Sequence, residues 1–488
     1  MKRRMLWVLA CAAACARLVA APESASAKAS PARPNVLLIT VDDLNDWVGA
    51  VGGHPQARTP VLDRLAAQGT VFTNAHCQAP ICHPSRVSFM TGTLPSTTGM
   101  YSMGPMDFRR DCEALRDPAE TPTLPEYFAA HGYRTMGVGK IFHNSSATDT
   151  FQEYGPRGDW GPFPKDGKKF VDAPGGSLWD WGRFPAQDSD TVDRTVADWA
   201  AARLAEPAER PFFLAAGFFR PHAPMYAPAP WWELQGDPAT IALPPHLATD
   251  REDISPFAQA LTYAATSPRH AYFETSGRWR EAVQAYLACL SFVDAQIGRL
   301  LEALERSPHA RNTIVVVLGD NGISLGEKSR WGKRSLWERD THVPLIVKAP
   351  GLPAGGRCAE PAGLVDIYPT LLELCGLKPA PRLEGRSLVP QLLEPAAPRP
   401  PTLTTFFVGN HAVRSRHHRY IRYADGTEEL YDHRNDPHEW HNLAGREEQR
   451  EVVRDLARFL PRVNRAPLPG STGLGIDPKH LDWFGGVP

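Results

Sequence analysis

Continuous apolar runs alternate with helical patterns over most of the chain. Asn35–Val41 is apolar and β-rich throughout and stops at Asp42 and Asp43, which is typical of a buried parallel strand. A helical pattern begins at Pro60 and ends at Gly69. Further strands are predicted at 135–138, 212–217, 313–318 and 345–348, and helices at 123–130, 191–204, 278–304 and 365–374. This alternation predicts a large, mostly parallel sheet with helices on both faces.

The pattern changes after a proline-rich stretch at 379–401, where we place a domain boundary. Short candidate strands follow at 402–408, 411–416, 420–423 and 429–431, separated by turns, and a helix is expected at 446–460. This part predicts a small antiparallel sheet with a helix packed on it. We therefore expect a large domain over residues 28–390 and a C-terminal α+β subdomain over residues 391–488.

The N-terminus has the features of a secretory signal peptide. Three basic residues precede an apolar run, and small residues continue up to Ala27. We expect cleavage near Ala27, so that residues 1–27 are removed; a competing site lies after Ala20, and Cys11 or Cys15 leaves a lipid-anchored form as an alternative. The apolar run is too short for a membrane anchor. The mature chain is therefore expected to be secreted or periplasmic, without a stable membrane span.

Charge narrows the choice of partners. Removing the signal peptide takes away four basic residues and one acidic residue, which changes the formal net charge from −1 to −4. A chain with this balance lacks the basic surface that nucleic acids require, so nucleic acid is not an expected partner. The 47 prolines, spread through long connections, fit a loop-rich extracytoplasmic enzyme.

Oxygen-bearing side chains follow two of the predicted strands. Asp42 and Asp43 come directly after the first strand, and Asp320 and Asn321 follow the strand at 313–318. Ligands bind at the carboxyl ends of parallel strands, and four oxygens there suit a hard divalent cation. Calcium is favoured over magnesium because it accepts many protein ligands in irregular geometry. Each pair alone would more often cap a loop; together they favour a metal site.

A cysteine lies at the start of another helical pattern. Cys82 precedes Pro84, which sets φ for helix entry, and Arg86 follows one turn later. A cysteine in the first turn of a helix lies among unpaired backbone N–H groups, and Arg86 adds a permanent positive charge on the same side. This grouping indicates chemistry on an anionic ester, whereas the plain alternative is a turn with a half-buried cysteine.

Three further segments carry candidate side chains. Lys140 and His143 follow a glycine-flanked strand end, and His222 stands between prolines after the strand at 212–217. Lys333 lies thirteen residues after Asp320. Each has a plain alternative, since a histidine between prolines can fill a turn and most lysines are solvated surface charges.

In their order along the chain and in their local sequence, these segments resemble the type I sulfatases over nearly all of residues 35–445. Within that family they resemble iduronate-2-sulfatase and its bacterial relatives. The resemblance rests on Asn35–Asp43, the Cys-x-Pro-Ser-Arg-x4-Thr-Gly motif at Cys82, Gly139–His143, Pro221-His222, Leu325–Glu327 with Trp331–Lys333, and Glu429–Asp432 with Asp436-Pro437. Two positions depart from iduronate-2-sulfatase, which has histidines where this chain has Asn321 and Lys328. Asn321 matches most other sulfatases, so the substrate is in doubt and the metal site is not.

The resemblance implies a fold, a reaction and a set of roles. The fold would be an alkaline-phosphatase-like sandwich with the small C-terminal subdomain. A formylglycine-generating enzyme would convert Cys82 to formylglycine, whose hydrate attacks the sulfur of a sulfate ester, and the substrate would be a sulfated carbohydrate. The implied roles are metal binding by Asp42, Asp43, Cys82, Asp320 and Asn321, binding of the hydrate and the anion by Arg86 and Lys140, assistance to sulfate release by His143, and action on the leaving group by His222 and Lys333.

Two other functions remain open at this point. A phosphonate or phosphodiester hydrolase can use the same scaffold and motif. An inactive carbohydrate-binding homologue is disfavoured because a competent residue fills every expected catalytic position.

Conversion of Cys82 would leave five cysteines in the mature chain, which argues against a full disulfide framework but leaves room for one bridge such as Cys77 to Cys112. Trp179, Trp181, Arg183, Trp231 and His411 are candidates for a saccharide cleft, although a core role is the more common one for such residues.

Overall fold

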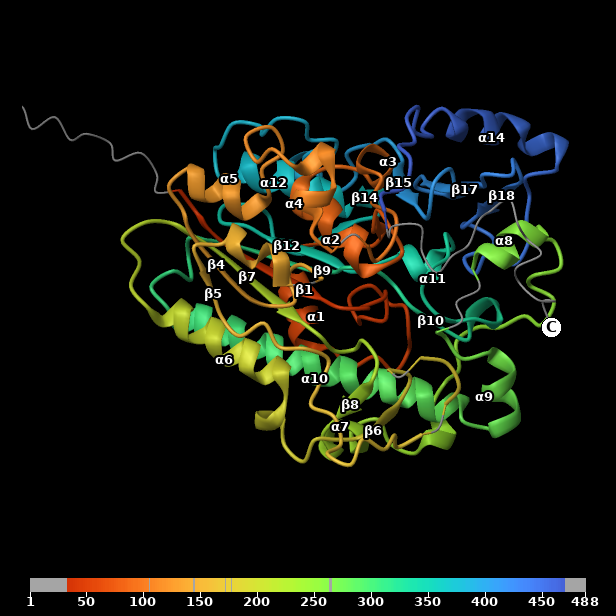
Figure 1. Cartoon of the computed structure of the whole chain (residues 1–488), viewed down its shortest axis with the longest axis horizontal. Helices are drawn as coiled ribbons and strands as arrows, with labels where there is room; N and C mark the ends of the chain where they lie inside the picture. Colours follow the sequence, from red (N-terminus) through yellow and green to blue (C-terminus); the bar gives the residue numbers. More distant parts are fainter. Residues whose placement is uncertain are drawn as a thin grey trace, which may run out of the picture. The chain divides into compact units, whose positions relative to one another are not determined.

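The computed structural model describes residues 33–469 except 105, 144, 172, 177 and 263–265, so the predicted signal peptide lies outside the described residues. Its central feature is an eight-stranded sheet (Figure 1). In order across the sheet, the strands are β13 (Gly356–Cys358), β2 (Thr70–Phe72), β12 (Leu345–Lys348), β9 (Thr313–Gly319), β1 (Asn35–Val41), β7 (Phe212–Phe218), β4 (Arg134–Gly139) and β5 (Glu153–Tyr154).

The register of the central strands determines where polar side chains leave the sheet. β1 runs parallel to both β7 and β9, and Val41 is aligned with Phe218 on one side and Gly319 on the other. Asp42 directly follows β1 and Asp320 directly follows β9, so both lie at the same edge of the sheet, at the carboxyl ends of these strands. Only β12 runs antiparallel to its neighbours β9 and β2, so the prediction of a mostly parallel sheet is confirmed.

Helices cover both faces of the sheet because alternate residues of each strand point to opposite sides. Leu37 and Ile39 pack into the core shared with α1 (Pro60–Gln68), α6 (Val192–Ala205) and α10 (Trp279–Arg306). Val36 and Leu38 pack into the other core, shared with α2 (Cys82–Thr91), α5 (Leu124–Ala130) and α12 (Ile367–Leu374). Figure 1 shows α6 and α10 below the sheet and α2, α5 and α12 above it.

The C-terminal part has the predicted antiparallel sheet, with β15 (Thr402–Thr405), β16 (His411–Arg414), β17 (His418–Arg422) and β18 (Glu428–Asp432) in sequence order. Helix α14 (Arg450–Ala457) packs on it through Leu456 and its neighbours. This helix is shorter than the predicted span because a single 3-10 turn, Glu447–Gln449, replaces its start. The division into residues 28–390 and 391–488 stays a prediction.

Short elements fill the connections. The strands are β3 (Ala75–His76), β6 (Trp181–Arg183), β8 (Met225–Ala227), β10 (Ser324–Leu325), β11 (Trp331–Gly332) and β14 (Ala362–Gly363), and the helices are α3 (Pro95–Thr98), α4 (Phe108–Asp111), α7 (Ala229–Glu233), α8 (Pro256–Leu261), α9 (His270–Ser276), α11 (Glu338–Thr341) and α13 (Val389–Leu393). Within the described residues, no helix combines the length and the apolar character needed to span a bilayer.

The cysteines of the described chain are all buried free thiols. The bridge considered between Cys77 and Cys112 is not formed. The Cys77 thiol faces the carbonyl of Asp340 at 3.8 Å, whereas the Cys112 thiol faces the carbonyl of Thr98 at 3.4 Å.

Candidate active site

The carboxylates predicted at the strand ends form one buried cluster. Asp42 and Asp320 are fully buried, and Asp43 is 3% exposed. The backbone N–H of Asp43 donates to Oδ1 of Asp320 at 3.0 Å, and Nδ2 of Asn321 donates to Oδ1 of Asp43 at 2.8 Å. Asp43 has a left-handed backbone, with φ of 56°, an uncommon conformation for a residue other than glycine. This turn brings both consecutive aspartates into the cluster.

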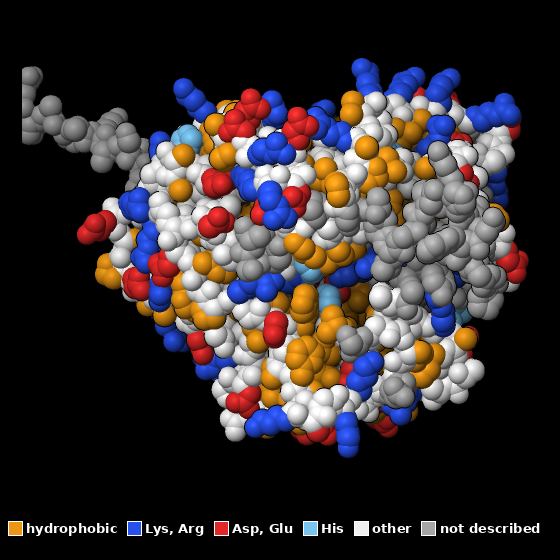
Figure 2. Space-filling model, in the orientation of Figure 1, with side chains coloured by type: hydrophobic (Ala, Val, Ile, Leu, Met, Phe, Trp, Pro, Cys, Tyr) orange, Lys and Arg blue, Asp and Glu red, His pale blue; other side chains and the backbone are white. Residues whose placement is uncertain are grey.

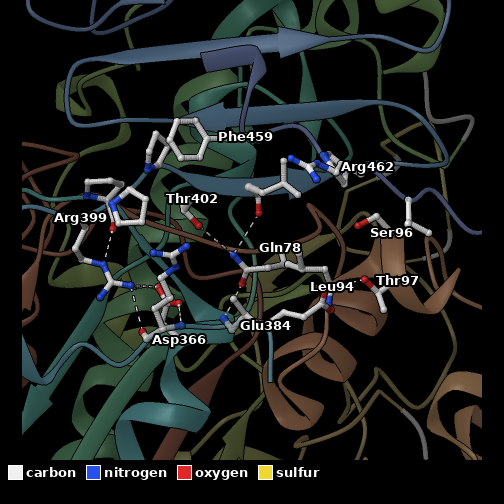
Figure 3. A pocket seen from close by; sticks show the side chains of 18 residues that line it. Gln78, Leu94, Ser96, Thr97, Asp366, Glu384, Arg399, Thr402, Phe459 and Arg462 are labelled. Atoms are coloured by element: carbon white, nitrogen blue, oxygen red, sulfur yellow. Dashed lines mark hydrogen bonds and ion pairs between the residues drawn. The ribbon is translucent and has the colours of Figure 1, made fainter. Parts of the chain in front are cut away.

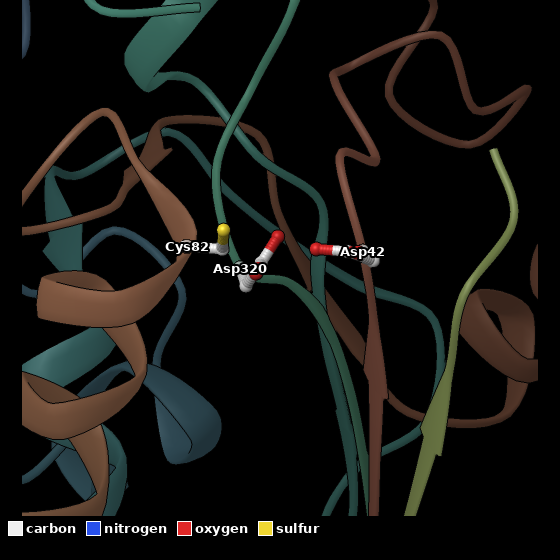
Figure 4. Close-up of side chains that lie close together, drawn as sticks. All are labelled: Asp42, Cys82 and Asp320. Carbon is white, nitrogen blue, oxygen red and sulfur yellow. The ribbon is translucent and has the colours of Figure 1, made fainter. Parts of the chain in front are cut away.

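Cys82 faces this cluster from the first turn of α2. Figure 4 shows its sulfur opposite the carboxylates of Asp42 and Asp320, and one ligand atom of each lies within 4.8 Å of the other two. Burial raises the pKa of the Cys82 thiol. The Sγ atom lies 3.4 Å from Nδ1 of His143 and 3.7 Å from Nζ of Lys333.

Two fully buried cations hold the carboxylates in place. Nε of Arg86 donates to Oδ2 of Asp320 at 2.7 Å, and Lys140 forms an ion pair with Asp42. Burial alone would raise the pKa of Asp42, but Lys140 and other nearby cations hold it well below its usual range. Gly217 allows the approach of this segment, since a Cβ there would lie 2.1 Å from the carbonyl oxygen of Lys140.

The predicted binding of the substrate anion by Arg86 and Lys140 stays a prediction. The second guanidinium arm of Arg86 is directed at backbone carbonyls, including that of Ile141 at 3.1 Å. Both cations therefore lie against the carboxylates.

Unpaired oxygens in the cluster fit a cation. Oδ1 of Asp42 and Oδ1 of Asn321 are buried and accept no hydrogen bond from the described residues, although Nη2 of Arg86 lies 3.5 Å from the first of them. A buried polar atom without a partner costs free energy and needs a physical explanation. Carboxylate and amide oxygens are the ligands of hard divalent cations, so this donor set fits calcium or magnesium.

A cavity of about 340 Å³ opens above the cluster, and its lining includes Cys82, His143, His222 and Lys333. Figure 2 shows histidine side chains near the centre of one face, between hydrophobic and basic ones. Burial lowers the pKa of His222 to about 4, and burial together with Lys140 lowers the pKa of His143. Lys333 behaves oppositely: burial opposes its charge, but the ion pair with Asp43 raises its pKa. The structure thus brings all the predicted site residues together at one edge of the sheet.

Sequence reasoning missed Trp160. Its Nε1 donates to Oδ2 of Asp42 at 3.3 Å, and its ring centroid lies 5.7 Å from that of His143 and 5.5 Å from that of His222. Nζ of Lys140 lies 4.9 Å from the same ring. Trp160 belongs to an irregular glycine- and proline-rich connection between β5 and β6, where no periodic pattern indicates which side chains face the site.

Two family descriptions match the chain over most of its length. The first, "Sulfatase", covers residues 34–377, and the second, "N-sulphoglucosamine sulphohydrolase, C-terminal", covers residues 326–466. The chain belongs to the sulfatase family. It is accordingly a sulfuric ester hydrolase, and the large sheet between helices with a small antiparallel sheet is the fold expected from the resemblance.

Named relatives agree with this assignment. The sulfatase is 42% identical over 447 residues to a "Sulfatase" of Formosa agariphila, covering 88% of this chain and 87% of the relative. It is 32% identical over 437 residues to human iduronate 2-sulfatase, covering 78% and 75%. Two solved structures share the fold: a "2-O GAG sulfatase" (TM-score 0.66, 24% identity, 88% and 91% covered) and the phosphonate monoester hydrolase of Agrobacterium radiobacter (TM-score 0.69, 23% identity, 87% and 94% covered).

Of the aromatic and basic residues considered for a saccharide cleft in the sulfatase, Trp179 lines the cavity. Trp181 is 1% exposed and stacks on Phe273 in the core. His411 is buried in the C-terminal sheet, where Nδ1 lies 3.0 Å from the Thr405 hydroxyl. The core role therefore holds for Trp181 and His411.

A second cavity of the sulfatase, of about 330 Å³, lies between α3, the loop before α13 and the start of β15 (Figure 3). Arg399 pairs with Asp366 at 2.8 Å in its wall, and Gln78 accepts a hydrogen bond from the backbone of Val365. None of the predicted site residues lines it, so the cavity above Cys82 is the candidate active site.

Proposed function

We propose that this sulfatase hydrolyses sulfate esters on a sulfated saccharide and that Cys82, converted to formylglycine, supplies the nucleophile. The observation that carries the proposal is the position of Cys82: it begins α2, faces two carboxylates and lines a cavity together with His222 and Lys333. This proposal includes a formylglycine-generating enzyme as a partner, and it includes a secreted or periplasmic location, which follows if the predicted signal peptide is removed.

The hydrated aldehyde supplies one hydroxyl that attacks sulfur and a second whose deprotonation releases sulfate and restores the aldehyde. The surrounding side chains suit this chemistry. His143 is held by Arg157, which donates to its carbonyl at 2.5 Å, and its Nδ1 lies 3.4 Å from the atom that conversion replaces. We assign His143 the proton of the second hydroxyl because of this short distance, and burial together with Lys140 favours the neutral imidazole that such a base requires.

Asp42, Asp43, Asp320 and Asn321, with the modified Cys82, would hold a divalent cation, for which calcium is favoured. A cation held by these residues would polarise the sulfate oxygens and lower the pKa of the attacking hydroxyl. The unpaired oxygens of Asp42 and Asn321 support this assignment. Arg86 and Lys140 contribute by keeping the carboxylates charged and in place.

We assign the leaving-group role to His222 and Lys333, which line the cavity together with Cys82. Nδ1 of His222 contacts the carbonyl of Ala223 and so donates to it, which leaves Nε2 as the second ring nitrogen, 3.7 Å from Oδ2 of Asp43. Protonated at Nε2, the ring can donate that proton to the departing alkoxide; a bound anion favours this protonated form against the burial that disfavours it. Lys333 keeps its charge beside Asp43 and stabilises the same alkoxide.

The test combines the mass of the peptide that contains Cys82 with the hydrolytic activity of protein variants at this position. Intact-mass analysis of active protein should show a loss of about 18 Da at the Cys82 peptide, the difference between a thiol and an aldehyde in cysteine oxidation. Cys82→Ala should abolish sulfate ester hydrolysis, and so should Cys82→Ser in a host that converts only cysteine. Cys112→Ala is the matched control, because this thiol is also buried but lies beside Thr98, away from the cluster. Full activity of Cys82→Ala would refute the proposal.

Hydrolysis of phosphonate or phosphate diesters is the alternative on the same scaffold, and it has support from the fold shared with a phosphonate monoester hydrolase. Paired rates on a sulfate ester and a phosphodiester with the same leaving group separate the two functions. Faster turnover of the phosphodiester by the purified enzyme would favour the alternative.

A further inference from the structure

One guanidinium in the active-site cavity differs from three arginines that pair with carboxylates. Arg86 pairs with Asp320, Arg339 with Asp46 and Glu327, and Arg419 with Glu338 and Glu439. In each of these the carboxylates outweigh burial and raise the pKa of the guanidinium. The cost of burying the charge is therefore offset by a partner within the protein.

Arg334 has no such partner. It lines the cavity beside Lys333, and within the described parts of the chain neither a carboxylate at ion-pair distance nor a hydrogen-bond acceptor is found for its guanidinium. The effect of burial is larger than the attraction of nearby Cys82 and Asp43, so the pKa of the Arg334 guanidinium is lowered. A partly buried cation without an ion-pair partner is unfavourable in the empty protein and becomes favourable when an anion binds.

The backbone directs Arg334 into the same cavity as its neighbour. Consecutive side chains of an extended segment point to opposite sides, yet Lys333 and Arg334 both line the cavity. Arg334 has φ of 84°, and this left-handed conformation breaks the alternation. Its N–H donates to the carbonyl of Pro80 at 3.1 Å, two residues before Cys82. The two cations are thus attached to the segment that positions the nucleophile.

Much of the remaining cavity wall is apolar and suits a sugar ring. Met103, Leu178, Trp179 and Ile323 line it, and the Trp179 ring packs edge-on against Trp331 with centroids 6.4 Å apart. Ligand sites typically combine such walls with a few polar groups that fix orientation. Lys333 is already paired with Asp43, so Arg334 is the cation left for a second polar group of the ligand.

We propose that Arg334 forms a second anion subsite, so that the preferred substrate is a sulfated sugar with another anionic substituent besides the sulfate that is cleaved. This inference rests on the proposed function, because it places the scissile sulfate at Cys82. The shared chemistry is a planar or tetrahedral oxyanion that accepts two hydrogen bonds from one guanidinium. A uronic acid carboxylate and a second sulfate both satisfy it.

The test measures binding without turnover. In a Cys82→Ala background, isothermal titration calorimetry compares a sulfated uronic acid, a doubly sulfated amino sugar and a neutral hexose with one sulfate. Adding Arg334→Gln should weaken binding of a sugar with a second anionic group about 10- to 100-fold more than binding of the hexose whose only charge is its one sulfate. This is the range expected for a hydrogen bond to a charged group. Arg334→Lys should restore part of the affinity. The anionic sugar that shows the larger loss identifies the substituent.

Arg306→Gln is the matched control, since this arginine is 81% exposed at the end of α10 and should leave all three affinities unchanged. Equal weakening of all three sugars by Arg334→Gln, or no weakening, would overturn the subsite. Failure of the proposed function is detected separately, by the mass of the Cys82 peptide and by hydrolysis of a simple aryl sulfate by the mature wild-type enzyme. An enzyme that cleaves aryl sulfates but binds neutral sulfated sugars as tightly as anionic ones would contradict only the subsite.

Discussion

This sulfatase has one buried and one partly buried cluster of charge, and both bring acidic and metal-ligating side chains within 4.8 Å of one another. The site cluster contains Asp42, Asp43, Asp320 and Asn321 beside Cys82. The C-terminal cluster contains Glu338, Glu439 and His433, with Arg414 and Arg419, where α11 meets the C-terminal sheet. Judged by proximity alone, either could bind a metal ion.

The C-terminal cluster has a partner for each carboxylate oxygen. Oε1 of Glu439 accepts from Nε of Arg419 at 2.6 Å and lies 3.0 Å from Nε2 of His433, and its Oε2 accepts from the backbone N–H of Glu338 at 2.8 Å. Glu338 in turn pairs with Arg419 and Arg414 through one oxygen, and Nδ1 of His342 lies 3.4 Å from the other. Two arginines therefore take the place that a metal ion would need.

Nearby acids are common to both clusters, so our proposal of a metal site rests on the unpaired oxygens of the site cluster. The site cluster keeps buried oxygens of Asp42 and Asn321 without hydrogen-bond donors, whereas the C-terminal cluster keeps none. Substitutions in the two clusters should therefore have different consequences. Breaking the site cluster should cost rate, and breaking the C-terminal cluster should cost stability.

The largest effect is expected from Asp320→Ala. This change removes a proposed ligand and the partner of Arg86, and turnover on every sulfate ester should fall by roughly two or more orders of magnitude, because a bound ion supplies several kcal/mol of charge stabilisation. Steady-state kinetics on folded protein tests this. If the rate per folded molecule stays the same and only the melting temperature falls, Asp320 is structural, like the acids of the C-terminal cluster.

A substrate-dependent effect is expected from His222→Ala. Good leaving groups need little protonation, so hydrolysis of an alkyl sugar sulfate should fall by on the order of 10²–10⁴, the contribution of general acid catalysis, and hydrolysis of an activated aryl sulfate far less. Lys333→Ala should show the same bias, more weakly if it acts only through its charge. Equal losses on both substrates would reassign these side chains to binding of the sulfate group.

Glu439→Gln should have the opposite outcome to Asp320→Ala. Removing one charge from a buried network leaves Arg419 without a full counter-charge, and the free energy of unfolding should fall by about 3–5 kcal/mol. The rate per folded molecule should be retained. Chemical denaturation and kinetics on the same preparation test both parts, with the exposed Glu305→Gln as control. A loss of rate at unchanged stability would place Glu439 in the catalytic machinery.

The smallest effect is a gradual loss of stability on acidification. Burial lowers the pKa of His270 and of His411 from 6.5 to about 4. Between these values the unfolded chain binds more protons than the folded one, so stability falls as the pH falls from about 6.5 to 4. Melting temperatures over this range should decline, and His411→Gln should make the decline shallower. The same slope in the variant would show that His411 does not contribute to it.

The fold and most of the site could be predicted because their signals are local. β1 and β12 have the predicted limits, since polar residues or turns bound their apolar runs, and Asp42 and Asp320 were found because each directly follows a strand. Trp160 and Arg334 could not be found this way. Trp160 lies in a long connection without periodicity, and the significance of Arg334 depends on the absence of a partner, which only the three-dimensional arrangement reveals.

The contacts that the Arg86 and Lys140 side chains make could also be found only from the structure. Their types and spacing fit anion binding, and the sequence has no means of showing that Asp320 and Asp42 would take up their charges. Long-range pairs of this kind form between segments far apart in the chain. Local patterns place each residue on its element, and the packing of elements decides what each side chain contacts.

The measurement that tests the central comparison most directly is the metal content of the wild-type, Asp320→Ala and Glu439→Gln proteins, determined by mass spectrometry of the elements after extensive dialysis. We predict one calcium ion per wild-type chain, loss of the ion in Asp320→Ala and full retention in Glu439→Gln. Retention of the ion in Asp320→Ala together with its loss in Glu439→Gln would contradict the account, because the metal would then belong to the cluster whose oxygens are all paired.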